Sequence, residues 1–217
     1  VNGLVGSEMC IRDRPIIAST ILCDEKVTLQ NLPYLQDITT MFELLGSMGS
    51  EILLDEDMNF TIASHSLSDI EARYELVKTM RASILVLGPL VAKYGKARIA
   101  LPGGCAIGSR PVNYHLDALK QMGAKIVLKN GYIEASAKKL LGASIKFDGV
   151  TVTGTENIMM AATLAKGTTV LTNVAKEPEI IDLADMLITM GAKIDGAGSD
   201  KIIIEGCLLY TSDAADD

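Results

Sequence analysis

The chain has 217 residues, 48% of them hydrophobic, and a formal net charge of −7. This length and apolar fraction suffice for the core of one sizeable domain, and the negative charge argues against a nucleic-acid-binding surface. The longest apolar stretch, Ala82 to Ala92, is about half the length of a membrane span and contains Gly88-Pro89. Four cysteines without metal-ligand spacing, and the lack of a secretory signal, predict a cytoplasmic protein with free thiols.

The two ends of the chain are predicted to be non-native. The peptides MCIRDR (9–14) and CLLYTS (207–212) can be encoded by opposite strands of one DNA segment, which resembles a transposon end used in sequencing libraries. We therefore expect one domain over residues 15–206, flanked by non-native ends at 1–14 and 207–217.

Between these ends, one pattern of elements occurs three times, at Val27 to Ser64, Ala97 to Ser136 and Thr168 to Gly206. Each copy reads as a short strand, a loop, an amphipathic helix that ends at a Met-Gly pair, and two strands joined by a polar turn. The glycine of each pair is the residue type that best closes a helix in the left-handed conformation. The polar turns are expected at 55–59, 129–131 and 196–200.

A second, more apolar helix is predicted before each copy, at Pro15 to Leu22, Ile70 to Tyr94 and Glu156 to Ala165. The sequence thus predicts an α/β fold of three βαβαββ-like units, the first without its opening strand. We expect the units to lie around a pseudo-threefold axis, with the more apolar helices inside and the strands outside.

The second copy differs from the others in one loop, LPGGCAIGSRP (Leu101 to Pro111). Its glycines allow a backbone to approach a ligand closely. Arg110 favours the thiolate of Cys105 and can hold a phosphate or a carboxylate. A repeat that departs from its own pattern at one loop indicates a function for that loop, although a buried structural cysteine in a turn is the alternative.

Three segments resemble the enolpyruvyl transferase family: YELVKTMRAS (74–83), LPGGCAIGSRPVNYHLDAL (101–119) and VTVTGTENIMMAATLA (150–165). The resemblance runs from about residue 15 to 206 and is to the members that use UDP-N-acetylglucosamine. It implies an inside-out α/β barrel and transfer of the enolpyruvyl group from phosphoenolpyruvate to the 3-hydroxyl of UDP-N-acetylglucosamine, the first committed step of peptidoglycan synthesis. It implies no metal or organic cofactor, and neither a nucleic acid nor a membrane as partner.

The resemblance also implies the roles of individual residues. Cys105 corresponds to the general acid that protonates the methylene carbon of phosphoenolpyruvate, a role that a tunable thiol suits. Asn113 stands where many members carry aspartate, and Gly149 where some relatives carry lysine. The residues that match substrate-binding positions are Arg81, Arg110, Pro111, Val112, Asn113, Tyr114, Thr151 and Val152.

In the family, a Lys-Asn pair before the first helix grips phosphoenolpyruvate, and a second domain of the same fold supplies an aspartate base and further arginines. The residues before Pro15 are EMCIRDR, without such a pair, and few residues follow Gly206. We therefore expect an incomplete fragment that is inactive alone and whose partner is the missing second domain.

Other functions stay open at this point. A non-catalytic repeat scaffold for a protein partner predicts three equivalent loops, and a half-domain that binds the nucleotide sugar without turnover is a further alternative. A thiol hydrolase or redox protein needs a positioned base or a partner cysteine, and His65 and His115 carry no recognisable signature. For His115, packing against the sheet is at least as good an explanation as contact with a ligand. Cys23 is expected to pack in the core.

Overall fold

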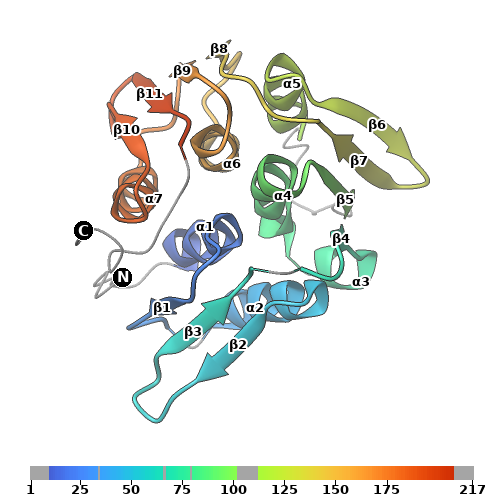
Figure 1. The fold of residues 1–217 in the computed structure, drawn as a ribbon, viewed down its shortest axis with the longest axis vertical. Coiled ribbons are helices and arrows are strands. Elements are labelled where there is room, and N and C mark those ends of the chain that lie inside the picture. Colours follow the sequence, from blue (N-terminus) through green and yellow to red (C-terminus); the bar gives the residue numbers. More distant parts are fainter. Residues whose placement is uncertain (1–9, 34, 66, 79, 102–111, 208–217) are drawn as a thin grey trace.

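The computed structural model describes residues 10–33, 35–65, 67–78, 80–101 and 112–207 (Figure 1). The helices are α1 (Cys10–Ser19), α2 (Gln36–Met48), α3 (Tyr74–Val77), α4 (Leu87–Tyr94), α5 (Asn113–Gln121), α6 (Val152–Thr163) and α7 (Pro178–Thr189), with 3-10 segments η1 (Thr20–Leu22) and η2 (Arg81–Val86). The strands are β1 (Val27–Leu29), β2 (Glu51–Leu54), β3 (Phe60–Ala63), β4 (Glu71–Ala72), β5 (Lys96–Ala100), β6 (Lys125–Lys129), β7 (Tyr132–Ser136), β8 (Ser144–Lys146), β9 (Thr168–Thr172), β10 (Lys193–Asp195) and β11 (Lys201–Glu205). None of these helices is both long and apolar enough to cross a membrane.

The described strands form three separate sheets of related topology. Their strand orders are β1-β3-β2, β4-β5-β7-β6 and β8-β9-β11-β10. In the two four-stranded sheets the opening strand is parallel to its neighbour and the hairpin pairs are antiparallel. The α/β fold class predicted from the sequence is therefore confirmed, and these sheets do not close into a barrel within the described residues.

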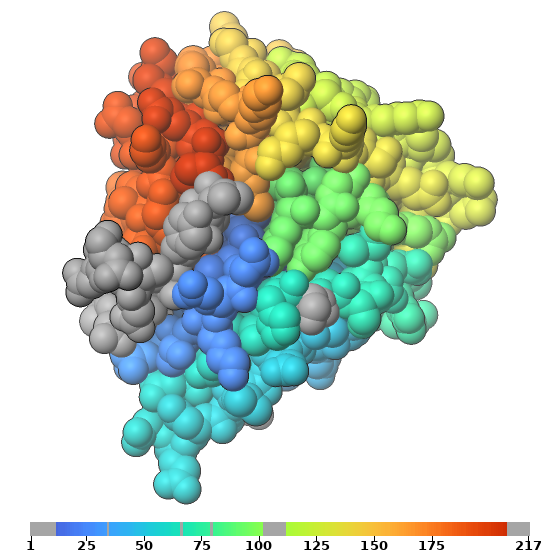
Figure 2. Space-filling view, in the orientation of Figure 1, coloured from blue at the N-terminus to red at the C-terminus, as the bar shows by residue number. Residues whose placement is uncertain are grey.

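The apolar helices lie inside and the hairpins lie at the periphery (Figure 1). Helix α6 contacts α4, α5 and α7, and α1 contacts α2 and α7. Every residue of α6 from Gly154 to Thr163 is buried, including the polar residues Thr155, Glu156, Asn157 and Thr163, so α6 is the central helix of the core. In the space-filling view, the N-terminal segment (blue) lies between the third unit (orange to red) and the green segment that contains η2 and α4 (Figure 2).

The predicted helix ends are confirmed. Helices α2, α5 and α7 are followed at Gly49, Gly123 and Gly191 by backbone with φ of 106°, 91° and 98°. This left-handed conformation is strained for residues with a side chain, so the Met-Gly signal marks the end of the helix reliably. The predicted turns join β2 to β3, β6 to β7 and β10 to β11.

The single helix predicted over Ile70 to Tyr94 is wrong. This segment contains β4, α3, η2 and α4, and Met80 has extended backbone with φ −139° and ψ 107°. Pro89 lies in the first turn of α4, where its missing N–H has no helical acceptor to lose. Only the second half of the segment, Ala82 to Ala92, is a buried apolar run, and burial alone does not distinguish one long helix from several short segments.

The helix predicted over Glu156 to Ala165 begins earlier than expected, because Thr151 caps it. The Thr151 side-chain oxygen accepts a hydrogen bond from Gly154 N at 3.2 Å. The helix predicted over Pro15 to Leu22 begins at Cys10 and continues as η1, so residues 10–14 of the predicted non-native end are helical.

Two helical glycines are expected to respond oppositely to alanine. A Cβ on Gly88 would lie 2.4 Å from the backbone oxygen of Asn157, whereas a Cβ on Gly46 would meet nothing nearer than Ile52 Cδ1 at 4.0 Å. Gly88→Ala should therefore lower the free energy of unfolding by about 1–3 kcal/mol through overpacking. Gly46→Ala should raise it by about 0.5–1 kcal/mol through helix propensity. Urea unfolding measures both, and stabilisation by Gly88→Ala would contradict the close approach of α4 to α6.

Candidate functional site

One pocket, with a volume of about 570 Å³, lies where α1, η2, α5, α6 and α7 meet. Five residues predicted to bind substrate line it: Arg81, Val112, Tyr114, Thr151 and Val152. The remaining lining residues are Arg14, Ala82, Ile84, Leu85, His115, Val150, Thr153, Glu156 and Glu179. The pocket thus brings together three segments that are distant in the sequence, around Arg81, Val112 and Thr151.

The other predicted site residues are placed differently. Asn113 opens α5 but is exposed and does not line the pocket. Cys105, Arg110 and Pro111 lie outside the described residues, so their predicted roles stay predictions.

The local structure explains why the lining residues converge. Arg81 opens η2 directly after the extended Met80, and Val112 directly precedes α5. Thr151 is the N-terminal cap of α6. The pocket is therefore lined by the guanidinium groups of Arg14 and Arg81, by the carboxyl groups of Glu156 and Glu179, and by the first turns of two helices. Backbone N–H groups at a helix start and a nearby cation both favour an anion, so the pocket suits a phosphate-bearing ligand.

His115 is a buried, neutral member of the pocket wall. Burial lowers its pKa from 6.5 to about 4, with a smaller contribution from Arg81. Asn157 Nδ2 donates to His115 Nδ1 at 2.9 Å, and the hydroxyl of Thr153 lies 3.4 Å from His115 Nε2. The ring of His115 therefore packs against helix α6, through Asn157 and Thr153, and not against a sheet as expected from the sequence.

Glu156 and Glu179 bring two carboxyl groups to the wall formed by α6 and α7. Glu156 is 1% exposed, and its Oε1 has no hydrogen-bond partner among the described residues. Burial and the negative charge of Glu179 raise the pKa of Glu156 to about 8, against an opposing effect of Arg14. The side chain is therefore largely protonated at neutral pH.

Sequence reasoning missed Glu156 and Glu179, which line the pocket, and Asn157, which lies behind it and donates to His115. The available signal was their position: Glu156 and Asn157 are polar residues within an apolar helix, where polar side chains need a partner. Arg14 was also missed, because it lies in the predicted non-native end; it pairs with Asp37 at 3.1 Å.

Tyr114 and Gly149 are in close contact across the pocket rim. A Cβ on Gly149 would lie 2.7 Å from the Tyr114 hydroxyl, so this ring position requires a residue without a side chain at 149. The two positions are therefore coupled, and a lysine at 149 would need a different orientation of Tyr114.

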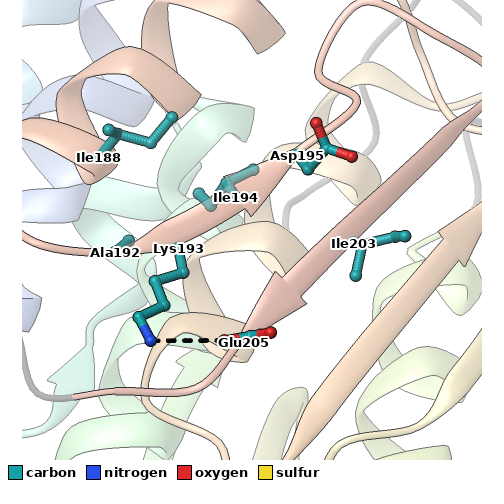
Figure 3. A pocket seen from close by; sticks show the side chains of 7 residues that line it. All are labelled: Ile188, Ala192, Lys193, Ile194, Asp195, Ile203 and Glu205. Carbon is teal, nitrogen blue, oxygen red and sulfur yellow. Dashed lines mark ion pairs between the residues drawn. The ribbon is translucent and has the colours of Figure 1, made fainter.

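A second, more open pocket of about 370 Å³ lies between the end of α7 and the hairpin β10–β11 (Figure 3). Its walls are mainly apolar, and Lys193 Nζ lies 3.6 Å from Glu205 Oε2 across the two strands. It contains none of the predicted site residues. Within the described residues, no group of three or more His, Cys, Asp or Glu side chains is placed to hold a metal ion.

Comparison with known proteins places these observations in a family. The sequence profile described as EPSP synthase (3-phosphoshikimate 1-carboxyvinyltransferase) matches residues 5–211. The chain belongs to this enolpyruvyl transferase family. The resemblance inferred from the sequence is thereby confirmed, and the family is one of transferase enzymes.

Among curated relatives, the UDP-N-acetylglucosamine 1-carboxyvinyltransferase of Magnetococcus marinus is 57% identical over 192 residues, which cover 88% of this chain and 46% of the relative. The chain thus spans about half the length of this relative.

Solved structures of enolpyruvyl transferases share the fold. The enolpyruvyl transferase NikO from Streptomyces tendae aligns with a TM-score of 0.79 at 22% identity, covering 93% of this chain and 48% of NikO. An EPSP synthase from Acinetobacter baumannii aligns with a TM-score of 0.73 at 20% identity, covering 94% of this chain and 46% of the synthase.

Proposed function

We propose that this chain is one domain of an enzyme that transfers the enolpyruvyl group from phosphoenolpyruvate to the 3-hydroxyl of UDP-N-acetylglucosamine. The observation that carries the proposal is the 57% identity to a relative named for this activity. The structural neighbours, at 20–22% identity, support the fold and leave the substrate open.

The proposed reaction proceeds by addition and then elimination. The 3-oxygen of the sugar forms a bond to C2 of phosphoenolpyruvate while Cys105 protonates the methylene carbon, and the hydroxyl proton goes to a base. Loss of a proton from the new methyl group then expels phosphate and restores the double bond. A thiol that is tuned near neutral pH suits the proton transfer to carbon.

The described pocket is proposed to hold the nucleotide sugar. Arg81 and the first turns of α5 and α6 provide the positive environment that a diphosphate requires. Tyr114, Thr151 and Val152 line the same space and offer hydroxyl and apolar contacts. Arg110, Pro111, Val112 and Asn113 complete the proposed contacts, and we assign the protein to peptidoglycan synthesis in the cytoplasm.

We further propose that residues 15–206 form three units around a pseudo-threefold axis, as in an inside-out α/β barrel. The related strand order of the three sheets supports this arrangement. Superposition of the units is the test, and failure of two units to overlay would contradict it. A second domain and a Lys-Asn pair are proposed to complete the cleft, because positioning of both substrates supplies much of the rate.

Calorimetric titration with UDP-N-acetylglucosamine tests the proposal on this chain. We expect binding without release of phosphate when phosphoenolpyruvate is added. Arg81→Ala should weaken the affinity by about 10- to 100-fold, because a charge-assisted hydrogen bond contributes about 1.5–3 kcal/mol. Arg98→Ala is the matched control, since Arg98 pairs with Glu71 and lies outside the pocket.

The outcomes separate the candidate functions. Binding that depends on Arg81 and not on Arg98 supports the transferase domain. Absence of binding by the unmodified chain, or equal loss in both variants, would contradict a nucleotide-sugar site in this pocket.

A further inference from the structure

Three of the segments that line the pocket, η2, α5 and α6, meet at the side chain of Asn157. It lies on α6 with 0% exposure. Its Oδ1 accepts a hydrogen bond from Gly88 N of α4 at 2.7 Å, and its Nδ2 donates to Ile84 O of η2 at 3.0 Å. Nδ2 also donates to His115 Nδ1 of α5 at 2.9 Å. The buried side chain of Asn157 on α6 therefore joins η2, which begins at Arg81, to α5, which begins at Asn113.

The hydrogen-bond donors and acceptors around Asn157 and His115 fix the orientation of the Asn157 amide and the position of the proton on the His115 ring. Because the Gly88 N–H needs an acceptor, Oδ1 of Asn157 must face α4, and both Nδ2 hydrogens are then used by Ile84 O and His115 Nδ1. His115 must therefore accept at Nδ1 and carry its proton on Nε2, facing the Thr153 hydroxyl. A charged imidazolium would place a second N–H against the Asn157 amide, so this arrangement requires the neutral ring.

The backbone around Asn157 leaves little freedom for adjustment. A Cβ on Gly88 would lie 2.4 Å from both the backbone oxygen and Oδ1 of Asn157, so α4 and α6 are already at their closest approach. At the other side of His115, the first turn of α5 is closed by His115 N and Leu116 N, which donate to Val112 O at 3.1 and 3.3 Å. A shift of the imidazole therefore moves the residues that begin α5.

We infer that Asn157 and His115 are positioning residues that set the start of α5 and the Arg81 segment relative to α6, and so set the spacing of the nucleotide-sugar contacts. The inference rests on the proposed function of this pocket. Neither side chain is assigned a contact with the reacting atoms. Their effect is exerted through Val112 and Tyr114 on one side and through η2 on the other.

The experiment compares two near-isosteric changes on the same helix. Asn157→Leu removes the three hydrogen bonds. Thr163→Val removes one buried hydrogen bond, from Thr163 Oγ1 to Met160 O at 2.7 Å, and Thr163 does not line the pocket. Both variants should melt below the unmodified chain. Only Asn157→Leu should speed amide hydrogen exchange at His115 and Leu116, by at least tenfold, and weaken UDP-N-acetylglucosamine binding by at least tenfold.

Asn157→Asp keeps the proposal testable where Asn157→Leu does not fold. The carboxylate still accepts from Gly88 N, but its second oxygen now faces His115 Nδ1, so a proton on Nδ1 becomes favourable. By NMR, His115 should then titrate above its ordinary value rather than near 4, despite the nearby Arg81. Affinity for the nucleotide sugar should fall at pH 8 and recover in part at pH 6, where the ring is charged.

Two results would overturn the inference: unchanged exchange at the start of α5 in a folded Asn157→Leu variant, or an unchanged His115 titration in Asn157→Asp. If the unmodified chain binds no UDP-N-acetylglucosamine, the proposed function fails, and the exchange rates and the His115 titration still decide whether Asn157 holds α5 in place.

Discussion

Replacing Glu156 by glutamine is expected to raise the free energy of unfolding at pH 8 by about 2–4 kcal/mol. Burial and Glu179 raise the pKa of Glu156 from 4.5 to about 8 in the folded chain. The unfolded chain loses this proton near pH 4.5, whereas the folded chain keeps it to about pH 8. Between about pH 4.5 and 8, Glu156 must therefore either take up a proton on folding or be buried as a charged carboxylate. Both cost free energy, so the free energy of unfolding falls as the pH rises. Glutamine has the same shape and avoids both.

His115 opposes this effect over part of the range. Its pKa is lowered from 6.5 to about 4, so the unfolded chain binds a proton that the folded chain does not, and stability rises with pH between these values. Between about pH 4.5 and 6, Asp13 acts in the same direction as Glu156, because burial raises the pKa of Asp13 from 3.8 to about 6, so His115 offsets only one of these two carboxyl groups. Between about pH 6.5 and 8 only Glu156 of these three groups changes its protonation on folding, so the stability of the unmodified chain should decline there at up to about 1.4 kcal/mol per pH unit.

Urea unfolding at a series of pH values measures this difference. Glu156→Gln should show no decline between pH 6.5 and 8, and below pH 6 its stability should change little, because the opposite contributions of Asp13 and His115 offset each other there. Glu56→Gln is the control, because Glu56 is exposed in the β2–β3 turn, and its profile should match that of the unmodified chain. Loss of stability at pH 8 in Glu156→Gln would show that the carboxylate is charged and favourably paired, and would contradict the assignment.

The elements that the sequence predicted well are those specified by local signals. Gly49, Gly123 and Gly191 end their helices because a left-handed residue is needed at each position, and that need is visible in the sequence. The segment Ile70 to Tyr94 was misjudged because the apolar run Ala82 to Ala92 reports burial, and burial does not reveal that the backbone is extended at Met80.

The same distinction holds in the site. Arg81, Tyr114 and Thr151 were named from the family motifs, and the structure places all three in the wall of one pocket. Asn157 and Glu156 could not be assigned from the sequence. The role of Asn157 depends on Gly88, 69 residues away, and that of Glu156 on Glu179 in the next helix of the third unit. Such pairings become visible only when the helices have packed.

A maleimide is expected to modify Cys105 at least ~100-fold faster than Cys23, because thiolate reactivity depends on both pKa and access. Cys23 is 0% exposed, and burial raises the pKa of its thiol. Its modification therefore requires local opening of the fold. Cys105 is followed by Gly108 and Arg110 in the sequence, and a nearby guanidinium favours the thiolate. A mass-spectrometric time course with peptide mapping gives both rates in one sample.

A second measurement, in a two-domain enzyme that contains this domain, tests whether the Cys105 thiol is the proposed catalytic acid. There, Cys105→Ala should abolish turnover while leaving the affinity for UDP-N-acetylglucosamine within about threefold, because the proposed nucleotide contacts are made by other residues. Cys23→Ala is the control and should keep turnover. If Cys23 is modified first, or if Cys105→Ala retains full turnover, then Cys105 is not the acid, and the loop from Leu101 to Pro111 must act through Arg110 or its backbone.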